Sequence, residues 1–171
     1  LIALAGRSKE GRISLGSEKY EADHLRKLHS TLLGKIGETI RYGYRPASAT
    51  EKETVGSRDH PIVSVDDHRS FIQVLFSVSQ AGLEAQRPSI AFFTTNYDTL
   101  LEDALALEQI PYAVGFIGGA TAFWSPDRSF GDTNNPAPPT RARVYKLHGS
   151  VDWYLGPSGE VFRCREGCNY P

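Results

Sequence analysis

The stretch SIAFFTTNYDTLLE, residues 89–102, decides the fold class that the sequence predicts. Residues 89–95 are a short apolar run bounded by Pro88 and Asn96, which is typical of a strand buried on both faces of a parallel sheet. Residues 97–108 then carry leucines and alanines at helical spacing. Because a strand, a tight polar turn and a helix make half of a βαβ unit, the sequence predicts an α/β fold.

A second strand with the same kind of ending is predicted over residues 143–147. It stops at His148 and Gly149, much as the first strand stops at Asn96 and Asp98. In an open parallel sheet, ligands bind in the crevice beyond the carboxyl ends of the strands. If both strands lie in one sheet, we expect Asn96, Asp98 and His148 to converge on one crevice.

Two further helices are predicted N-terminal to this sheet. One is expected to run from Ser17, as its cap, to near Gly43, on an apolar stripe at three- and four-residue steps. The other is expected to begin at Asp66 or Asp67 and to end between residues 82 and 88. The packed face of this second helix is predicted to hold Phe71, Val74, Leu75 and Val78.

The remaining segments predict short strands and loops. A strand is expected over residues 112–117, and a hairpin over 151–163 turns at Gly-Pro-Ser-Gly. Three segments without apolar periodicity are predicted to be loops: residues 7–17, 46–61 and 120–142.

Composition excludes several classes of function. The 171 residues include 19 basic and 20 acidic side chains, so the charge surplus of a nucleic-acid or anionic-membrane binder is missing. No apolar run approaches the roughly 18 residues of a membrane span. Two cysteines are too few for a disulfide scaffold, so we expect a cytoplasmic protein. The chain lacks methionine and begins in an apolar run, and we expect a single domain that is a piece of a longer protein.

The polar residues at the two strand ends suit chemistry at a sugar carbon. An asparagine offers a donor and an acceptor at any pH, and an aspartate adds a fixed negative charge. A histidine can remove a proton from a hydroxyl group or a water molecule. Because no serine or cysteine nucleophile accompanies them, the trio fits cleavage of a glycosidic bond to a cationic ring better than acyl transfer.

Each of these residues also has a purely structural interpretation. Thr95 and Asp98 have the spacing of a helix capping box. Asn96 can be a turn residue, and His148 can simply close a strand. The other histidines, His24, His29, His60 and His68, are predicted to be surface residues.

Together, FFTTNYDTLLE (residues 92–102) and VYKLHGSVDW (residues 144–153) closely resemble the SIR2-like domain of bacteria, a divergent relative of the sirtuins. The resemblance implies a Rossmann-like parallel sheet flanked by helices, with a small irregular or zinc-type appendage. It implies that Asn96 and Asp98 contact the nicotinamide ribose and the nicotinamide of NAD. It assigns His148 as general base on a ribose hydroxyl and makes Asn96 and His148 the catalytic pair. Thr95, Asp98 and Gly149 are then NAD-binding residues.

The sequence departs from the sirtuin pattern at two places. The Gly-Ala-Gly-x-Ser loop that cradles the pyrophosphate is absent, and we expect it to precede residue 1 in a longer protein. Sirtuins also carry four zinc-binding cysteines, of which Cys164 and Cys168 supply only half. This pair is either part of a zinc site completed elsewhere or two unpaired thiols, and we predict no metal site from this chain.

Three functions remain open from the sequence. The resemblance favours an NAD glycohydrolase that cleaves NAD to nicotinamide and ADP-ribose, as in bacterial anti-phage defence. The alternatives are an NAD-dependent protein deacylase of the sirtuin type and a non-catalytic module that senses NAD or ADP-ribose. Because unrestrained NAD destruction would be toxic, the first function implies control by homo-oligomerisation or by a regulatory partner protein.

Overall fold

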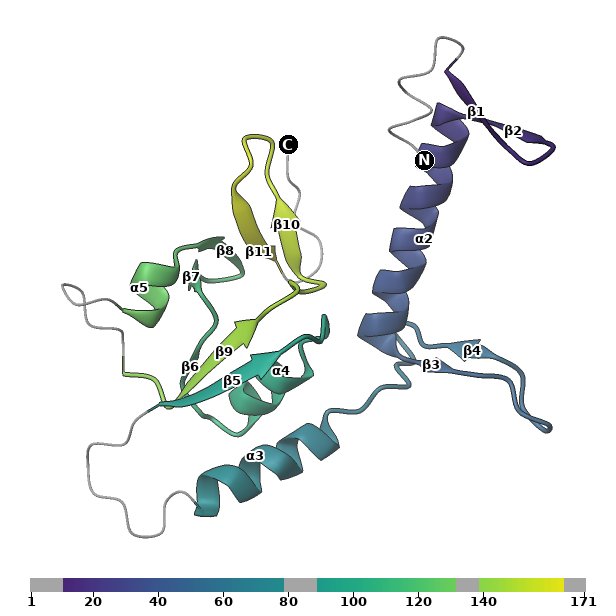
Figure 1. Cartoon of the computed structure of the whole chain (residues 1–171). Coiled ribbons are helices and arrows are strands. Elements are labelled where there is room, and N and C mark those ends of the chain that lie inside the picture. The colour runs from purple at the N-terminus through teal and green to yellow at the C-terminus, as the bar shows by residue number, and fades with distance from the viewer. Residues whose placement is uncertain (1–10, 79–88, 132–138, 165–171) are drawn as a thin grey trace. The chain divides into compact units, whose positions relative to one another are not determined.

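The computed structural model describes residues 11–78, 89–131 and 139–164. The chain divides into two compact units with the boundary after Ile62, and each unit is described by itself. Helices and strands carry the labels of Figure 1.

The N-terminal unit combines a hairpin, one long helix and a second small hairpin (Figure 1). Strands β1 (Arg12–Leu15) and β2 (Glu18–Glu21) pair antiparallel. Helix α2 (Ala22–Tyr42) follows directly, and β3 (Tyr44–Arg45) pairs with β4 (Thr54–Val55). The predicted helix is confirmed, but its predicted start is wrong because Ser17 lies in the turn between β1 and β2.

The core of this unit is small. Ala22 and Leu25 are buried, with Ile13 and Tyr20 packed against them. Further along α2 the predicted apolar stripe is largely exposed, since Leu28, Leu32 and Ile36 show 46%, 53% and 53% of their surface. The hairpins also correct the prediction that residues 7–17 and 46–61 are entirely loop.

The C-terminal unit is built on a parallel sheet. Strand β9 (Ala142–Lys146) lies between β5 (Ile90–Thr94) and β6 (Tyr112–Ala113), and both neighbours run parallel to it. Helix α3 (Asp66–Val78) precedes the sheet in sequence, and α4 (Leu100–Leu107) connects β5 to β6. The predicted α/β class is therefore confirmed, with three parallel strands in the described part of the sheet.

A second, antiparallel sheet completes this unit (Figure 1). Its strand order is β10 (Trp153–Leu155), β11 (Val161–Cys164), β8 (Thr121–Trp124) and β7 (Phe116–Gly118). The predicted hairpin over 151–163 is confirmed as β10 and β11. The segment 120–142, predicted as loop, contains β8 and the short helix α5 (Pro126–Phe130).

The predicted strand over 112–117 is split between the two sheets at Gly115. This glycine has φ +87°, and a Cβ at its position would lie 2.2 Å from the Trp124 ring. A side chain would therefore be strained and would collide, so only glycine allows the chain to turn here. The local apolar pattern could not reveal this change of sheet.

The core of the C-terminal unit joins α3, α4 and the parallel sheet. Ile72, Leu105 and Val144 are fully buried, and Phe76 lies with them. The predicted packed face of α3 is wrong in part, since Phe71 and Val74 are 53% and 63% exposed.

Strand β5 was predicted to be buried on both faces, and it is not: its burial alternates along the strand, and Phe93 is 67% exposed and stacks on Tyr145 with ring centroids 4.9 Å apart. No helix among the described residues is long and apolar enough to cross a membrane.

Candidate active site

The carboxyl ends of β5 and β9, the two strands that the sequence predicts, lie side by side. Thr94, the last residue of β5, is in register with Lys146, the last residue of β9. The Leu147 N–H continues the ladder by donating to the Thr94 carbonyl oxygen at 2.9 Å. The Val151 N–H donates to the Tyr97 carbonyl oxygen at 2.9 Å, which ties together the two loops that follow the strands. Both loops therefore leave the sheet at the same carboxyl edge.

The loop after β5, residues 95–99, is organised by short-range hydrogen bonds. The Asn96 N–H donates to Thr94 Oγ1 at 3.0 Å, and the Leu100 N–H donates to Asp98 Oδ1 at 3.1 Å. Thr99 Oγ1 donates to Asp103 Oδ2 at 2.9 Å in the first turn of α4. Asp98 thus stabilises the start of the helix with one carboxylate oxygen, but the predicted capping box of Thr95 and Asp98 is wrong, because the N-cap of α4 is Thr99.

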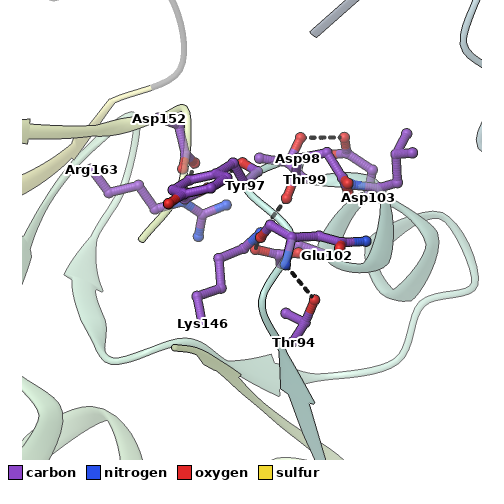
Figure 2. A network of polar contacts seen from close by, with 12 residues as sticks. Thr94, Tyr97, Asp98, Thr99, Glu102, Asp103, Lys146, Asp152 and Arg163 are labelled. Carbon is purple, nitrogen blue, oxygen red and sulfur yellow. Dashed lines mark hydrogen bonds and ion pairs between the residues drawn. The ribbon is translucent and has the colours of Figure 1, made fainter. Parts of the chain in front are cut away.

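A buried ion pair lies beneath this loop (Figure 2). Lys146 Nζ is 3.3 Å from Glu102 Oε1, and both side chains are 3% exposed. The same ammonium donates to the carbonyl oxygen of Asn96 at 3.3 Å and to that of Asp98. One cation therefore connects the end of β9, helix α4 and the loop after β5.

The electrostatics of the pair are dominated by desolvation. Burial raises the pKa of the Glu102 carboxyl group, and the attraction of Lys146 opposes this rise without cancelling it. Glu102 Oε2 is buried and has no hydrogen-bond partner among the residues that the structure describes.

A cleft of about 330 Å³ opens at this edge of the sheet. This volume lies at the lower end of the range typical of small-molecule sites, ~300–1,000 Å³. Its walls come from α3, β5, the loop after β5, α4 and the end of β9. The lining residues are Asp67, His68, Phe71, Phe92, Phe93, Thr94, Asn96, Asp98, Leu101, Glu102 and Lys146.

The predicted site residues do not all reach this cleft. Asn96 and Asp98 line it, from the exposed and half-buried parts of one loop. His148 lies at the same sheet edge but is exposed and outside the lining, with its ring 6.4 Å from that of Tyr97. Thr95 is exposed beside Asn96, and Gly149 has φ +97°, a left-handed conformation that favours glycine.

A second ion pair connects the end of the loop after β9 to strand β11 (Figure 2). Arg163 Nε donates to Asp152 Oδ2 at 2.8 Å, and the Asp152 side chain is 7% exposed. The Cys164 N–H donates to the Asp152 carbonyl oxygen at 2.9 Å. Strand β11 thereby holds the residues that follow His148 and Gly149.

Three cleft residues were missed by sequence reasoning. His68, predicted to be at the surface, is half-buried in the cleft wall, and its buried Nδ1 has no partner within the described part of the chain. Glu102 and Lys146 carried a weak signal, because each is a charge in a largely apolar segment that holds one other charge, Asp103 in the helix and Arg143 in the strand. A buried charge is rarely left unpaired, so the two could have been matched.

Metal ligation finds no candidate in the described ranges. No group of three or more His, Cys, Asp or Glu side chains within residues 11–78, 89–131 and 139–164 could hold an ion. Cys164 is buried and disulfide-bonded, so it is not an unpaired thiol. Cys168 lies outside the described residues.

The fold is that of an α/β protein with a cleft at the carboxyl edge of a small parallel sheet. Residues 90–162 match the family model of the SIR2-like domain. The chain therefore carries a SIR2-like domain over these residues, which include β5, α4, β9 and both strand-end loops. This family is related to the sirtuins and generally consists of NAD-consuming enzymes. No curated protein matches the chain.

Proposed function

We propose that this protein is an NAD glycohydrolase, which cleaves NAD with water to nicotinamide and ADP-ribose. The observation that carries the proposal is the cleft at the shared end of β5 and β9, lined by Asn96 and Asp98. These strands and loops lie inside the SIR2-like match, whose family generally consumes NAD.

The protein mainly has to orient the reactants and to stabilise the charge that develops on the ribose. Water attacks C1′ of the nicotinamide ribose, and the C1′–N bond breaks with its electron pair passing to the ring nitrogen. The leaving nicotinamide becomes neutral, and the ribose passes through an oxocarbenium-like state. Fixed dipoles and charges near such a state lower its free energy without reorganisation.

Each site residue has a proposed role in this step. The Asn96 carboxamide orients the attacking water or a ribose hydroxyl, since it both donates and accepts. The Asp98 carboxylate stabilises the developing positive charge on the ribose. His148, in the loop after β9, acts as general base and accepts the proton that the attacking water loses. Thr95 and Gly149 contribute to NAD binding.

Two broader inferences accompany the activity. We infer that the SIR2-like domain begins before residue 90, because Asp67, His68 and Phe71 of α3 line the same cleft as Asn96. We also infer a role in bacterial anti-phage defence through NAD depletion. Such an enzyme requires control, either by self-association or by a partner protein.

The test is incubation of the full chain with NAD alone, with products separated by chromatography. Release of nicotinamide and ADP-ribose without any peptide is the expected result. Release that requires an acyl-lysine peptide would replace hydrolysis by deacylation. Saturable NAD binding without product would replace it by a sensing role.

A further inference from the structure

We propose that Lys146 is a positioning residue, whose buried ammonium holds the loop of Asn96 and Asp98 by their backbone carbonyl groups. Glu102 in turn fixes the ammonium. The catalytic consequence rests on the proposed function, whereas the structural role of Lys146 can be measured without it.

The bonding of Lys146 matches its chemistry. An ammonium group has three N–H donors and no acceptor. Lys146 Nζ has three acceptors in the structure: the carbonyl oxygens of Asn96 and Asp98, and Glu102 Oε1 at 3.3 Å. The Lys146 side chain is 3% exposed, so the fold shields it from most of the solvent. The ammonium therefore fixes two backbone points that flank Tyr97 in one short loop.

Stability alone does not account for this arrangement. A buried ion pair recovers its desolvation cost poorly, and apolar residues of similar volume often serve stability as well or better. The two carbonyl groups held by Lys146 belong to Asn96 and Asp98, two residues that line the cleft. The feature that this pair secures is the conformation of the cleft wall.

The pairing with Glu102 also suits the ligand. An isolated ammonium beneath the cleft would repel the cationic nicotinamide ring and the developing ribosyl cation. Glu102 Oε1 balances that charge at 3.3 Å, so the lysine can act as a donor without an unfavourable field.

A double variant separates positioning from stability. Lys146→Met should lower both the melting temperature and the turnover of NAD, because it leaves Glu102 buried without its counter-charge. Adding Glu102→Gln removes that charge and should restore the melting temperature. Turnover should stay down about 10²-fold in the double variant, the effect typical of a slightly misplaced catalytic group. Recovery of turnover together with stability would overturn the proposal.

A second measurement does not depend on activity. Backbone hydrogen exchange of residues 96–100 in the full chain should be faster in the double variant than in the wild type. Arg69→Met is the matched control, since it removes the 2.8 Å ion pair between Arg69 of α3 and Glu108, the C-cap residue of α4, and neither residue lies in this loop. Unchanged protection of the loop in the double variant would overturn the proposal.

The outcomes keep the two proposals apart. A wild-type chain that does not cleave NAD, with a loop that loosens in the double variant, would reject the hydrolase and retain the positioning role. If the double variant does not fold, Glu102→Gln alone decides. It keeps all three acceptors for the ammonium, so the loop should stay protected. Loss of protection in that variant would show that the ion pair between Lys146 and Glu102 orders the loop. It would overturn the proposed role of the hydrogen bonds to the carbonyl groups.

Discussion

The two loops at the carboxyl edge of the parallel sheet are built differently. The loop after β5 is held from beneath by Lys146 and presents Asn96 and Asp98 to the cleft. The loop after β9 is supported by Asp152 and Arg163 but leaves His148 exposed and outside the cleft lining. The backbone of Asn96, one half of the proposed catalytic pair, is therefore held by a buried side chain, whereas His148, the other half, is exposed and lies outside the cleft lining.

The largest effect is expected from substitution of the exposed His148. His148→Ala should lower NAD hydrolysis about 10²–10⁴-fold, the usual contribution of a general base, and should leave the fold intact because the side chain is exposed. Initial rates at saturating NAD measure it. His60→Ala is the control, because His60 is an exposed histidine of the N-terminal unit. A wild-type rate in His148→Ala would remove the histidine from the mechanism.

Substitution of Asn96, in the loop held by Lys146, should lower turnover almost as much. Asn96→Ala should lower turnover about 10²–10³-fold, as expected for the loss of one oriented polar group. The melting temperature should not change, because the side chain is exposed and the bond from the Asn96 N–H to Thr94 remains. Steady-state kinetics and thermal unfolding measure the two effects. A loss of stability that parallels the loss of activity would favour the turn-residue interpretation of Asn96.

The backbone of the loop after β9 gives a smaller effect, on stability. Gly149→Ala places a side chain at φ +97°, which should lower the free energy of unfolding by ~1–2 kcal/mol. Steric collision does not add to this cost, since the nearest atom to the new Cβ is Trp153 Cε3 at 3.8 Å.

Urea unfolding measures the change at Gly149. Gly119→Ala is the matched control, because a Cβ there meets no atom within 4 Å and no positive φ is required. Equal stability of the two variants would contradict a strained turn after His148.

The smallest effect concerns pH and the pair beneath the first loop. Burial raises the pKa of Glu102 in the folded protein above its ordinary value of 4.5. At pH values between 4.5 and the raised pKa, the folded protein therefore binds more protons than the unfolded chain. The stability contributed by the protonated group is complete below pH 4.5 and is lost as pH rises through the raised pKa. Glu102→Gln removes this loss, so its stability relative to the wild type should increase with pH. Urea unfolding from pH 4 upward measures it, and parallel curves would contradict the raised pKa.

Local sequence patterns predicted the elements that depend on local order. The apolar run 89–95 became β5, and the run 143–147 became β9, each within one residue at either end. The hairpin over 151–163 was also predicted, because turn residues separate two alternating segments. Propensity and periodicity decide these features within a few residues of chain.

Other features depended on contacts that the local pattern does not contain. The start of α2 was displaced because the preceding residues pair as a hairpin. The strand over 112–117 was divided because Gly115 turns against Trp124, which follows it in sequence. The exposed face of β5 was missed because an apolar run predicts a strand but not which of its faces is covered.

The sequence by itself determined the α/β class, the two parallel strands and the polar residues at their ends, because short-range periodicity and turn chemistry encode them. The tertiary structure decided which of those residues share a cleft, since that depends on register and on side chains distant in the chain. It brought Lys146 under Asn96 and Asp98 and paired it with Glu102. The acceptors of the buried Lys146 ammonium come from residues distant in the chain, so they come together only when the sheet edge is assembled.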